Sequence, residues 1–414
     1  MFTAQAVKSR TTSSREGRVI VLRPKIRYET PITKDSERLM SDPLPQQSHS
    51  KPSVAPELLL RGIRKSFAGT TVIDGLDLDV NPGEYLVVLG PSGCGKSTLL
   101  RIIAGLIAPD AGQIESKSQP WQRLPPGERD VSILFQDDRL YPHWNLRKNL
   151  EIALRRSPTP TSTEAMTSLT DRLGIGGLLD RRPDQISGGQ LRRAALAKAL
   201  LRKPSICLLD EPLTAIDTTL REDVLQLLAD TPRDRGVSLS ATAIIHVTHD
   251  GDEAMRLADR IAVIGDGRVR QCGTPEDVYR HPNSIDVASA IGTPPPNLIP
   301  MTWVRDAMPD RYERFLRAIP DCNDTSILVV RPESIRIVPH EKSIAPNHSV
   351  DENEWWLPVT VESSRWIAGR WLHRLRIDTD KPSSLVAFSA ERLNFNKGGW
   401  CAVIRLDAVT ACRS

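Results

Sequence analysis

The sequence predicts an α/β domain that is followed by a smaller, β-rich one. Strand-like and helix-like segments alternate through residues 57–285, which is typical of a layered α/β domain. Within this region a glycine-rich loop separates the short apolar run 85–89 from a helical stretch at 96–106. After the proline-rich segment 292–297 the segments are short and strand-like, which favours a small barrel or sandwich.

The elements of the first domain follow from their hydrophobic patterns and turn residues. An Asn-Pro-Gly turn at 81–83 and an Asp-Gly turn at 266–267 mark chain reversals between apolar runs. Apolar runs bounded by such residues predict strands at 58–64, 76–80, 85–89, 131–135, 205–209, 243–247, 261–264 and 268–271. Longer stretches with helical composition predict helices at 96–106, 146–155, 164–173, 188–202 and 218–228.

The second domain is predicted from strands alone. They are expected at 326–330, 335–338, 357–362, 371–377, 385–388 and 400–406. Six of the eight tryptophans lie in this part of the chain. Packing in the core is the favoured interpretation of these side chains, and a surface for a ligand or partner is the alternative.

Composition limits the classes of function. The chain has 414 residues, 39% of them hydrophobic, and a formal net charge of +4. Two or three domains of about 100–200 residues fit this length. The charge is too small for a protein that coats nucleic acid, and no apolar run reaches the ~18 residues of a membrane-spanning helix. Residues 1–56 hold ten Lys and Arg against five Asp and Glu, and their Ser- and Pro-rich composition predicts a disordered basic extension with one possible strand at 19–22.

The strongest motif is the glycine-rich loop Gly-Pro-Ser-Gly-Cys-Gly-Lys-Ser at 90–97. It fits the phosphate-binding pattern G-x-x-x-x-G-K-[ST] and lies between a predicted strand and a predicted helix, as that pattern requires. Backbone N–H groups of such a loop surround phosphate oxygens, the lysine reaches the β- and γ-phosphates, and the Ser hydroxyl binds Mg²⁺. The predicted ATP-binding residues are Gly90, Pro91, Ser92, Gly93, Cys94, Gly95, Lys96, Ser97 and Thr98.

A second acidic motif follows the apolar strand predicted at 205–209. That strand delivers Asp210 to the end of the sheet, where its carboxylate can hold Mg²⁺ together with Ser97. Glu211 is then placed to polarise a water molecule for attack on the γ-phosphate. A purely structural carboxylate pair is the alternative interpretation.

The string Ile-Ser-Gly-Gly-Gln at 186–190 opens a predicted helix. A serine at this place can be only a helix N-cap. In this context, however, the chain resembles the nucleotide-binding subunits of ABC transporters, whose signature reads Leu-Ser-Gly-Gly-Gln. Ile186 replaces the leucine of that signature. The resemblance implies that Ser187, Gly188, Gly189 and Gln190 close over ATP held by the P-loop of a second copy.

The same resemblance assigns four more positions. Gln136 matches the Q-loop glutamine, which contacts Mg²⁺ and senses the transport domain. Asp217 in Thr-Ala-Ile-Asp matches the D-loop aspartate, and His249 in Val-Thr-His-Asp matches the switch histidine that contacts the γ-phosphate. Phe67 matches the aromatic residue that stacks on adenine, with a place in the core as the alternative.

The resemblance also narrows the subclass and the partners. Leu-Tyr-Pro-His at 140–143, the segment 273–282 and Arg-Pro-Glu at 331–333 are similar to stretches of the importer ATPases for maltose, glycerol-3-phosphate, spermidine and iron. It implies a P-loop NTPase of the ABC cassette type with a helical subdomain, and a C-terminal β-barrel similar to oligonucleotide-binding folds. The implied partners are a second nucleotide-binding subunit, membrane permease subunits and, indirectly, an external solute-binding protein, at the cytoplasmic face of the membrane.

The expected domains are therefore an extension at 1–56, a nucleotide-binding domain at 57–285 and a regulatory domain at 286–414. The expected function is ATP hydrolysis coupled to import of a sugar or similar small solute. A soluble ABC-type ATPase or a regulatory scaffold is the alternative. The intact Glu211 and His249 argue against a scaffold that only senses ATP.

Overall fold

The computed structural model describes residues 55–135, 140–155, 162–214, 216–230, 242–339, 353–379, 381, 383–393 and 399–413. These residues belong to one compact unit, 54–414. The strand predicted at 19–22 and the candidate Gln136 lie outside the described residues. Within the described part of the chain, no helix has the length and apolar character needed to cross a membrane.

A six-stranded sheet forms the centre of the first domain, with the order β10-β9-β3-β8-β7-β6. Its strands are β3 (Tyr85–Leu89), β6 (Val131–Leu134), β7 (Ile206–Asp210), β8 (Ala243–Thr248), β9 (Arg260–Gly265) and β10 (Arg268–Gly273). All neighbours run parallel except β10, which forms the predicted hairpin with β9. The predicted α/β architecture is confirmed.

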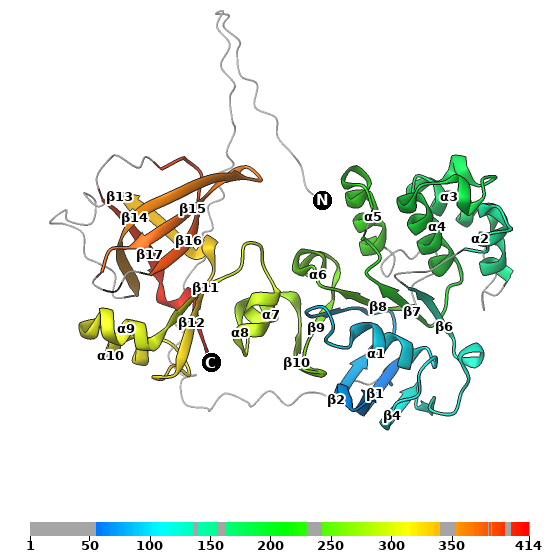
Figure 1. Ribbon diagram of the computed structural model, residues 1–414, viewed down its shortest axis with the longest axis horizontal. Helices are drawn as coiled ribbons and strands as arrows, with labels where there is room; N and C mark the ends of the chain where they lie inside the picture. The colour runs from blue at the N-terminus through cyan, green and yellow to red at the C-terminus, as the bar shows by residue number, and fades with distance from the viewer. Residues whose placement is uncertain are drawn as a thin grey trace, which may run out of the picture. The chain divides into compact units, whose positions relative to one another are not determined.

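The side chains of β3 alternate between two apolar clusters, which explains why this sheet is covered on both faces (Figure 1). Tyr85, Val87 and Leu89 lie in one apolar cluster, and Leu86 and Val88 lie in another. Because successive side chains of a strand point to opposite faces, each face needs its own cover. The five residues of β3 are all buried, as a central parallel strand requires.

The second of these clusters lies between the sheet and a separate antiparallel sheet of order β2-β1-β4-β5. Helix α1 (Lys96–Ile103) belongs to this layer through four buried leucine and isoleucine side chains. The strands are β1 (Leu58–Phe67), β2 (Thr70–Val80), β4 (Ala111–Ser116) and β5 (Gln119–Pro120).

Helices cover the other face. They are α2 (Leu146–Arg155), α3 (Thr163–Arg172), α4 (Gly188–Leu201), α5 (Thr218–Asp230), α6 (Gly251–Leu257), α7 (Pro275–Arg280) and α8 (Ile285–Ala290). In Figure 1, α2, α3 and α4 lie side by side as a helical group, and α4 contacts both of the others. Val287 of α8 packs in this core, while Ala288 packs against Val329 and Cys412 of the C-terminal part.

The C-terminal part is rich in β-structure. One sheet has the order β11-β12-β18 and the other β13-β17-β14-β15-β16. Their strands are β11 (Asn297–Pro300), β12 (Ser326–Val330), β13 (Ile335–Pro339), β14 (Glu354–Ile367), β15 (Arg370–Ile377), β16 (Ser384–Ser389), β17 (Trp400–Arg405) and β18 (Val409–Arg413). Residues of both sheets share one apolar cluster.

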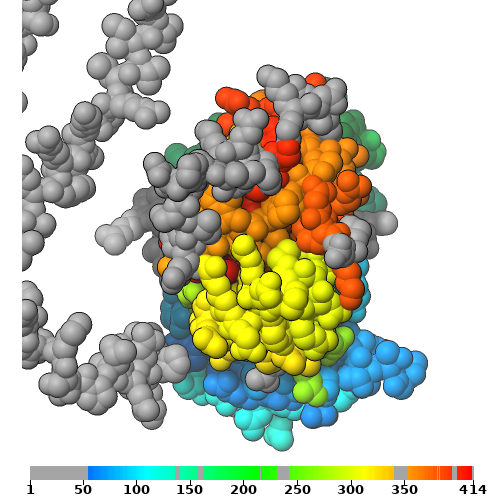
Figure 2. Space-filling view, turned by 90° about the vertical axis from the view of Figure 1, so that its left-hand side faces the viewer, coloured from blue at the N-terminus to red at the C-terminus, as the bar shows by residue number. Residues whose placement is uncertain are grey.

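Two helices join that cluster and correct the sequence prediction, which expected only strands here. They are α9 (Met301–Ala307) and α10 (Pro309–Ala318), seen as a continuous yellow mass beside the orange strands in Figure 2. Phe315 of α10 meets Trp355 of β14 edge to face, with ring centroids 4.7 Å apart. Both helices are short, and α10 is mostly polar with its few apolar residues gathered on one face, so neither length nor composition marked them as core helices.

Other boundaries shift for identifiable reasons. Helix α1 ends at Ile103 instead of the predicted 106, because Gly105 adopts a φ of 76° that ends the helix. Strand β2 begins at Thr70 instead of 76, since Ala68 and Gly69 at positive φ make a tight hairpin with β1. Among the tryptophans, Trp355 is 1% exposed, as predicted for the core, whereas Trp366 is 57% exposed and contradicts that prediction.

Candidate functional site

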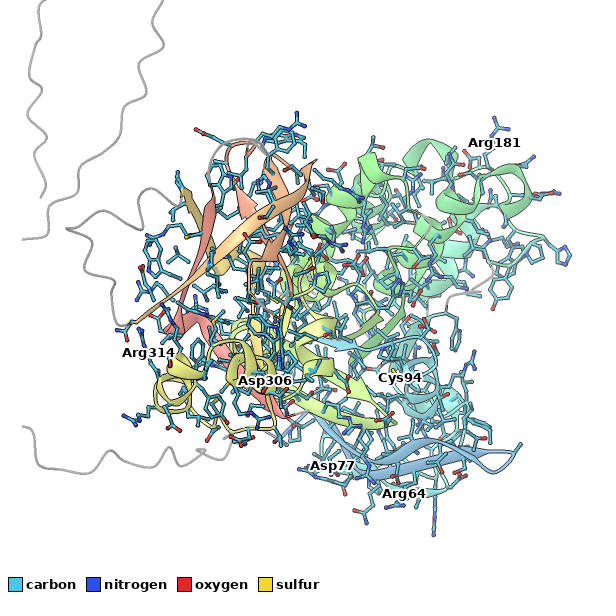
Figure 3. The ribbon with its side chains drawn as sticks, turned by 60° about the vertical axis from the view of Figure 1, so that its left-hand side comes forward. Arg64, Asp77, Cys94, Arg181, Asp306 and Arg314 are labelled. Carbon is cyan, nitrogen blue, oxygen red and sulfur yellow. The ribbon has the colours of Figure 1, made fainter. Side chains whose placement is uncertain are left out.

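The predicted phosphate-binding loop joins the end of β3 to the start of α1, as its motif requires. Figure 3 labels Cys94 at this place. Gly95 immediately precedes the helix with a φ of 102°, and a Cβ there would lie 2.9 Å from the Val72 carbonyl oxygen. A Cβ on Gly90 would lie 2.5 Å from the Ile264 carbonyl oxygen. The loop therefore needs glycine at both places to follow its path.

Lys96 lies along the inside of this loop. Its Nζ donates to the carbonyl oxygens of Gly90 and Pro91, at 2.7 and 2.9 Å, and the residue is 7% exposed. Burial and these acceptors keep the ammonium group close to the loop backbone. The positive charge is thus placed where the loop's N–H groups would also bind an anion.

Asp210 comes to the same place from the end of β7, and its Oδ1 accepts a hydrogen bond of 3.2 Å from Ser97 Oγ. Burial raises the pKa of Asp210 above its ordinary value, the Ser97 hydroxyl opposes this rise, and the charge of Glu211 adds to it. The carboxylate of Asp210 and the hydroxyl of Ser97 are hard oxygen donors side by side. These two residues therefore fit Mg²⁺.

Glu211 follows with an unusual backbone. Its φ is +47°, in the left-handed region that L-residues other than Asn and Asp rarely occupy. Its Oε1 lies 2.9 Å from Nδ1 of His249, which is 58% exposed at the end of β8. The adjacent parallel strands β7 and β8 thus deliver the two predicted catalytic side chains to one edge of the sheet.

These parts surround one cleft of about 320 Å³. It is lined by Val72, Ser92, Gly93, Gly95, Lys96, Ser97, Thr98, Glu211 and His249. The structure therefore brings the predicted phosphate-binding residues together with the predicted general base and switch histidine. Such a cleft can hold a triphosphate with a water molecule between its last phosphate and Glu211.

The predicted signature residues lie elsewhere. Ser187 caps α4: its Oγ accepts from Gln190 N–H at 3.3 Å, while Gln190 Oε1 accepts from Ser187 N–H at 2.9 Å. Among the described residues, the lining of the cleft includes none of the signature residues 187–190. The capping box explains why Ser and Gln occur three residues apart, independently of any ligand. Within one chain, then, this segment does not reach the cleft.

Two further candidates are exposed. Phe67 ends β1 with 43% of its surface accessible and Lys65 Nζ 5.4 Å from its ring, so the alternative of a core position for it is wrong. Asp217 is exposed at the start of α5, where its carbonyl oxygen accepts from the N–H groups of Leu220 and Arg221. Both side chains are available to a ligand or to a second protein chain.

Sequence reasoning missed two arginines that support the site. Arg192 of α4 is 8% exposed and donates to the backbone carbonyl oxygens of Asp210 and Glu211. Arg221 of α5 donates to Asp250 and to Glu253 at 2.6 Å each, immediately after His249. The signal for Arg192 was its position in the Ala- and Leu-rich helix 188–201, most of which is buried, because a buried guanidinium must find acceptors.

The pKa values of the carboxylates around Arg221 are low. Burial opposes the shift at Asp250, but Arg221 and the N–H groups of Asp252 and Glu253 hold its pKa below the usual range. At Glu253 burial again opposes the shift, but His246, whose Nε2 lies 3.5 Å from the carboxylate, and a hydrogen bond from the Thr248 hydroxyl outweigh it. Both carboxylates are therefore charged at neutral pH and fix the segment that follows His249.

Comparisons with known proteins show to which family the chain is related. The sequence model of the family described as ABC transporter matches residues 73–214. The sn-glycerol-3-phosphate import ATP-binding protein UgpC of Cereibacter sphaeroides is 40% identical over 301 residues, 72% of this chain and 84% of that protein. The xylose/arabinose import ATP-binding protein XacJ of Haloferax volcanii is 38% identical over 317 residues, 74% of this chain and 80% of that protein.

Among solved structures, an ATP-binding cassette in a dimeric post-hydrolysis state bound to ADP and Pi aligns with 53% of this chain and 98% of its own. The identity is 26% and the TM-score 0.47. The sequence identity to UgpC over most of both chains establishes the relationship. The chain belongs to the ABC transporter family, among the ATP-binding subunits of its importers.

Proposed function

We propose that this importer ATPase works as a head-to-tail pair of cassettes, with each ATP held between the P-loop of one chain and the signature of the other. The observation that carries the proposal is the cleft that joins Lys96 and Ser97 to Glu211 and His249, while residues 187–190 of the same chain lie outside it. A γ-phosphate in that cleft faces water on its open side, where electrostatic stabilisation is weak. A signature segment from a second chain supplies the missing N–H groups and excludes the water.

The residues of one chain divide the chemistry among them. The loop N–H groups and Lys96 bind the β- and γ-phosphates, and Ser97 and Asp210 hold Mg²⁺. Bound Mg²⁺ neutralises negative charge on the phosphate oxygens. Glu211 accepts a proton from the attacking water, and His249, hydrogen-bonded to Glu211 at 2.9 Å, orients that carboxylate and contacts the γ-phosphate. Gln136, outside the described residues, is proposed as a further Mg²⁺ ligand and sensor.

The remaining predicted residues are proposed to bind the adenine or to contact other protein chains. Phe67 is proposed to stack on the adenine, since it is the last residue of β1 and its ring is exposed. Asp217 is proposed to contact the second cassette. The segment after residue 136 is proposed to dock on the permease: Tyr141 is 43% exposed, and its ring lies 4.7 Å from that of Trp144.

The assembly is proposed to lie at the cytoplasmic face of the membrane, on permease subunits that receive solute from an external binding protein. Its solute is proposed to be a sugar or a similar small molecule, because the relatives are import proteins for glycerol-3-phosphate and for xylose and arabinose. The strands of residues 297–413 are proposed to form the small barrel-like regulatory domain of this class. ATP binding favours the closed pair, and hydrolysis reopens it, which moves the permease by a population shift.

The experiment compares the full chain with its Glu211→Gln variant. Wild type is expected to hydrolyse ATP only with Mg²⁺. The variant is expected to bind ATP with wild-type affinity and to turn over about 10²–10³-fold more slowly, as for loss of a preorganised catalytic group. Equal turnover by the two chains would remove Glu211 from the mechanism. Purification from detergent-solubilised membranes should bring permease subunits with the chain, and recovery with ribosomes instead would favour a soluble ATPase.

A further inference from the structure

The backbone of Glu211 needs an external support. A left-handed conformation of an L-residue costs on the order of 1–2 kcal/mol and persists only where surrounding contacts impose it. Glu211 has this conformation, with a φ of +47°, at the point where β7 ends and its carboxylate enters the cleft. The amide on one side is fixed by a hydrogen bond of 2.9 Å from Glu211 N–H to the Val247 carbonyl.

The peptide groups on both sides of Glu211 are also held by Arg192. Its Nη2 donates to the carbonyl oxygens of both Asp210 and Glu211, at 2.5 and 2.9 Å, so one guanidinium nitrogen bridges the two peptide groups that flank the strained residue. Its Nη1 donates to the carbonyl of Phe135, the last described residue before Gln136. A guanidinium stays charged and presents its donors in a rigid plane, which suits three carbonyls in fixed positions.

The position of Arg192 on α4 links the signature segment to the strands that end at the cleft. Helix α4 starts after Ser187, and Arg192 lies little more than one turn from that start. The same side chain therefore joins the signature helix, the end of β6 and the end of β7. Arg192 is only 8% exposed and is therefore shielded from water. Hydrogen bonds from a charged donor are strong in such a place, and their loss leaves buried carbonyls unpaired.

We propose that Arg192 is a positioning residue that holds Glu211 in its left-handed conformation and thereby aims the Glu211 carboxylate at the attacking water. The proposal rests on the proposed function of Glu211 as the general base. Arg192 touches neither ATP nor water in this scheme. Its loss lets the backbone relax and turns the carboxylate away, so it lowers the rate of the chemical step and leaves ATP binding by the P-loop unchanged.

Arg193 provides a matched control. It is the next residue on α4 and is 4% exposed, but its Nη1 donates to the carbonyl of Leu173, at 2.6 Å, and to that of Gly174, at 3.4 Å. Its Nε donates to the Gly189 carbonyl of its own helix, at 3.4 Å, and none of these bonds reaches residues 210 and 211. Arg192→Met and Arg193→Met each remove a buried guanidinium and keep a side-chain stem. Both leave buried carbonyls without a donor, so both lower the melting temperature. Only the first frees the peptide groups of residues 210 and 211.

The experiment measures kcat, KM and the affinity for a fluorescent ATP analogue in full-length chains, well below each melting temperature. We expect Arg192→Met to lower kcat at least about tenfold with ATP affinity within about twofold of wild type, because displacement of a catalytic group by about 1 Å has effects of this size. Arg193→Met should keep kcat within about twofold. Arg192→Lys keeps the positive charge but has fewer donors in fixed directions, so its kcat should lie between those of wild type and Arg192→Met. This variant provides the test if the methionine variant does not fold.

A second background separates this inference from the proposed function. In a Glu211→Gln chain the base is already lost, so adding Arg192→Met should reduce the residual turnover by less than about twofold. If Glu211→Gln turns over like wild type, the proposed base is wrong. If Glu211→Gln is impaired but Arg192→Met equals Arg193→Met, or lowers ATP affinity instead of kcat, or acts equally in both backgrounds, the positioning function is wrong while the base stands.

Discussion

Substitution of Gly95 by alanine tests whether the phosphate-binding loop has the geometry described. Gly95 has a φ of 102°, and an added Cβ would meet Val72 O at 2.9 Å and two side-chain carbons of Val72 and Ile73 at 3.3 Å. Backbone strain of about 1–2 kcal/mol and overpacking of about 1–3 kcal/mol sum to about 2–5 kcal/mol of lost stability. For a domain of this size that corresponds to a melting temperature lower by about 5–15 °C.

Two other glycines serve as controls for the loss of stability expected of Gly95→Ala. Gly93 has a φ of 84° but open space around its Cβ position, so Gly93→Ala should show the strain alone, about 1–2 kcal/mol. Gly188 opens α4 with open space and no positive φ, so Gly188→Ala should be neutral or up to about 1 kcal/mol more stable.

The assay is thermal unfolding of the nucleotide-free chains, followed by titration with a fluorescent ATP analogue. The expected order of stability is Gly188→Ala, then Gly93→Ala, then Gly95→Ala, and Gly95→Ala should also bind ATP more weakly because α1 must shift. A Gly95→Ala chain as stable as Gly93→Ala would refute the close approach of the loop to β2.

Three further predictions follow from other parts of the site. Phe67→Ala should weaken ATP binding by about 5–150-fold, the equivalent of about 1–3 kcal/mol for a lost base–aromatic contact, with kcat at saturation unchanged; a wild-type affinity would exclude stacking. Arg221→Ala should destabilise the chain by about 1–2 kcal/mol at pH 7, a value reduced for its partial exposure, as measured by denaturant unfolding. Against the effect of burial, Arg221 lowers the pKa of Asp250 in the folded chain, so this contribution is complete above the ordinary Asp value of 3.8 and disappears as the pH falls below it. The gap between wild type and variant should therefore close there, and a gap independent of pH would contradict the ion pair. Deletion of residues 1–56 should leave ATP hydrolysis by the assembled transporter unchanged, and its loss from a folded protein would assign the extension a function.

Local patterns predicted the parts of the fold that lie near the site. The apolar run Tyr85–Leu89 and the helix Leu146–Arg155 occur at the predicted bounds, because burial of a whole strand and a regular apolar periodicity are visible along the chain. Helices α9 and α10 were missed because their fold depends on packing against Trp355, a residue about 40 positions away along the chain. Tertiary contacts of that kind leave little trace in a short segment.

The site likewise combines features that local sequence predicts with features that depend on tertiary packing. The loop around Lys96 and the carboxylates after β7 are recognisable because their chemistry requires particular residues at fixed spacing. The left-handed backbone of Glu211 and its contacts to Arg192 could not be predicted, since nothing in the residue type of a glutamate favours a positive φ. Arg192 meets Glu211 only after α4 packs against the sheet.

Hydrolysis of ATP between two chains can be tested by mixing two inactive variants. Lys96→Ala removes the phosphate-binding ammonium, and Ser187→Arg places a bulky charge in the signature. Each homodimer should be nearly inactive, but a mixed dimer contains one site with an intact Lys96 from one chain and an intact Ser187 from the other. We expect mixing to restore up to half of the activity per mixed dimer. Absence of any recovery in mixed dimers shown to form by differential tagging, together with a Glu211→Gln chain that never dimerises with ATP, would contradict a site shared between chains.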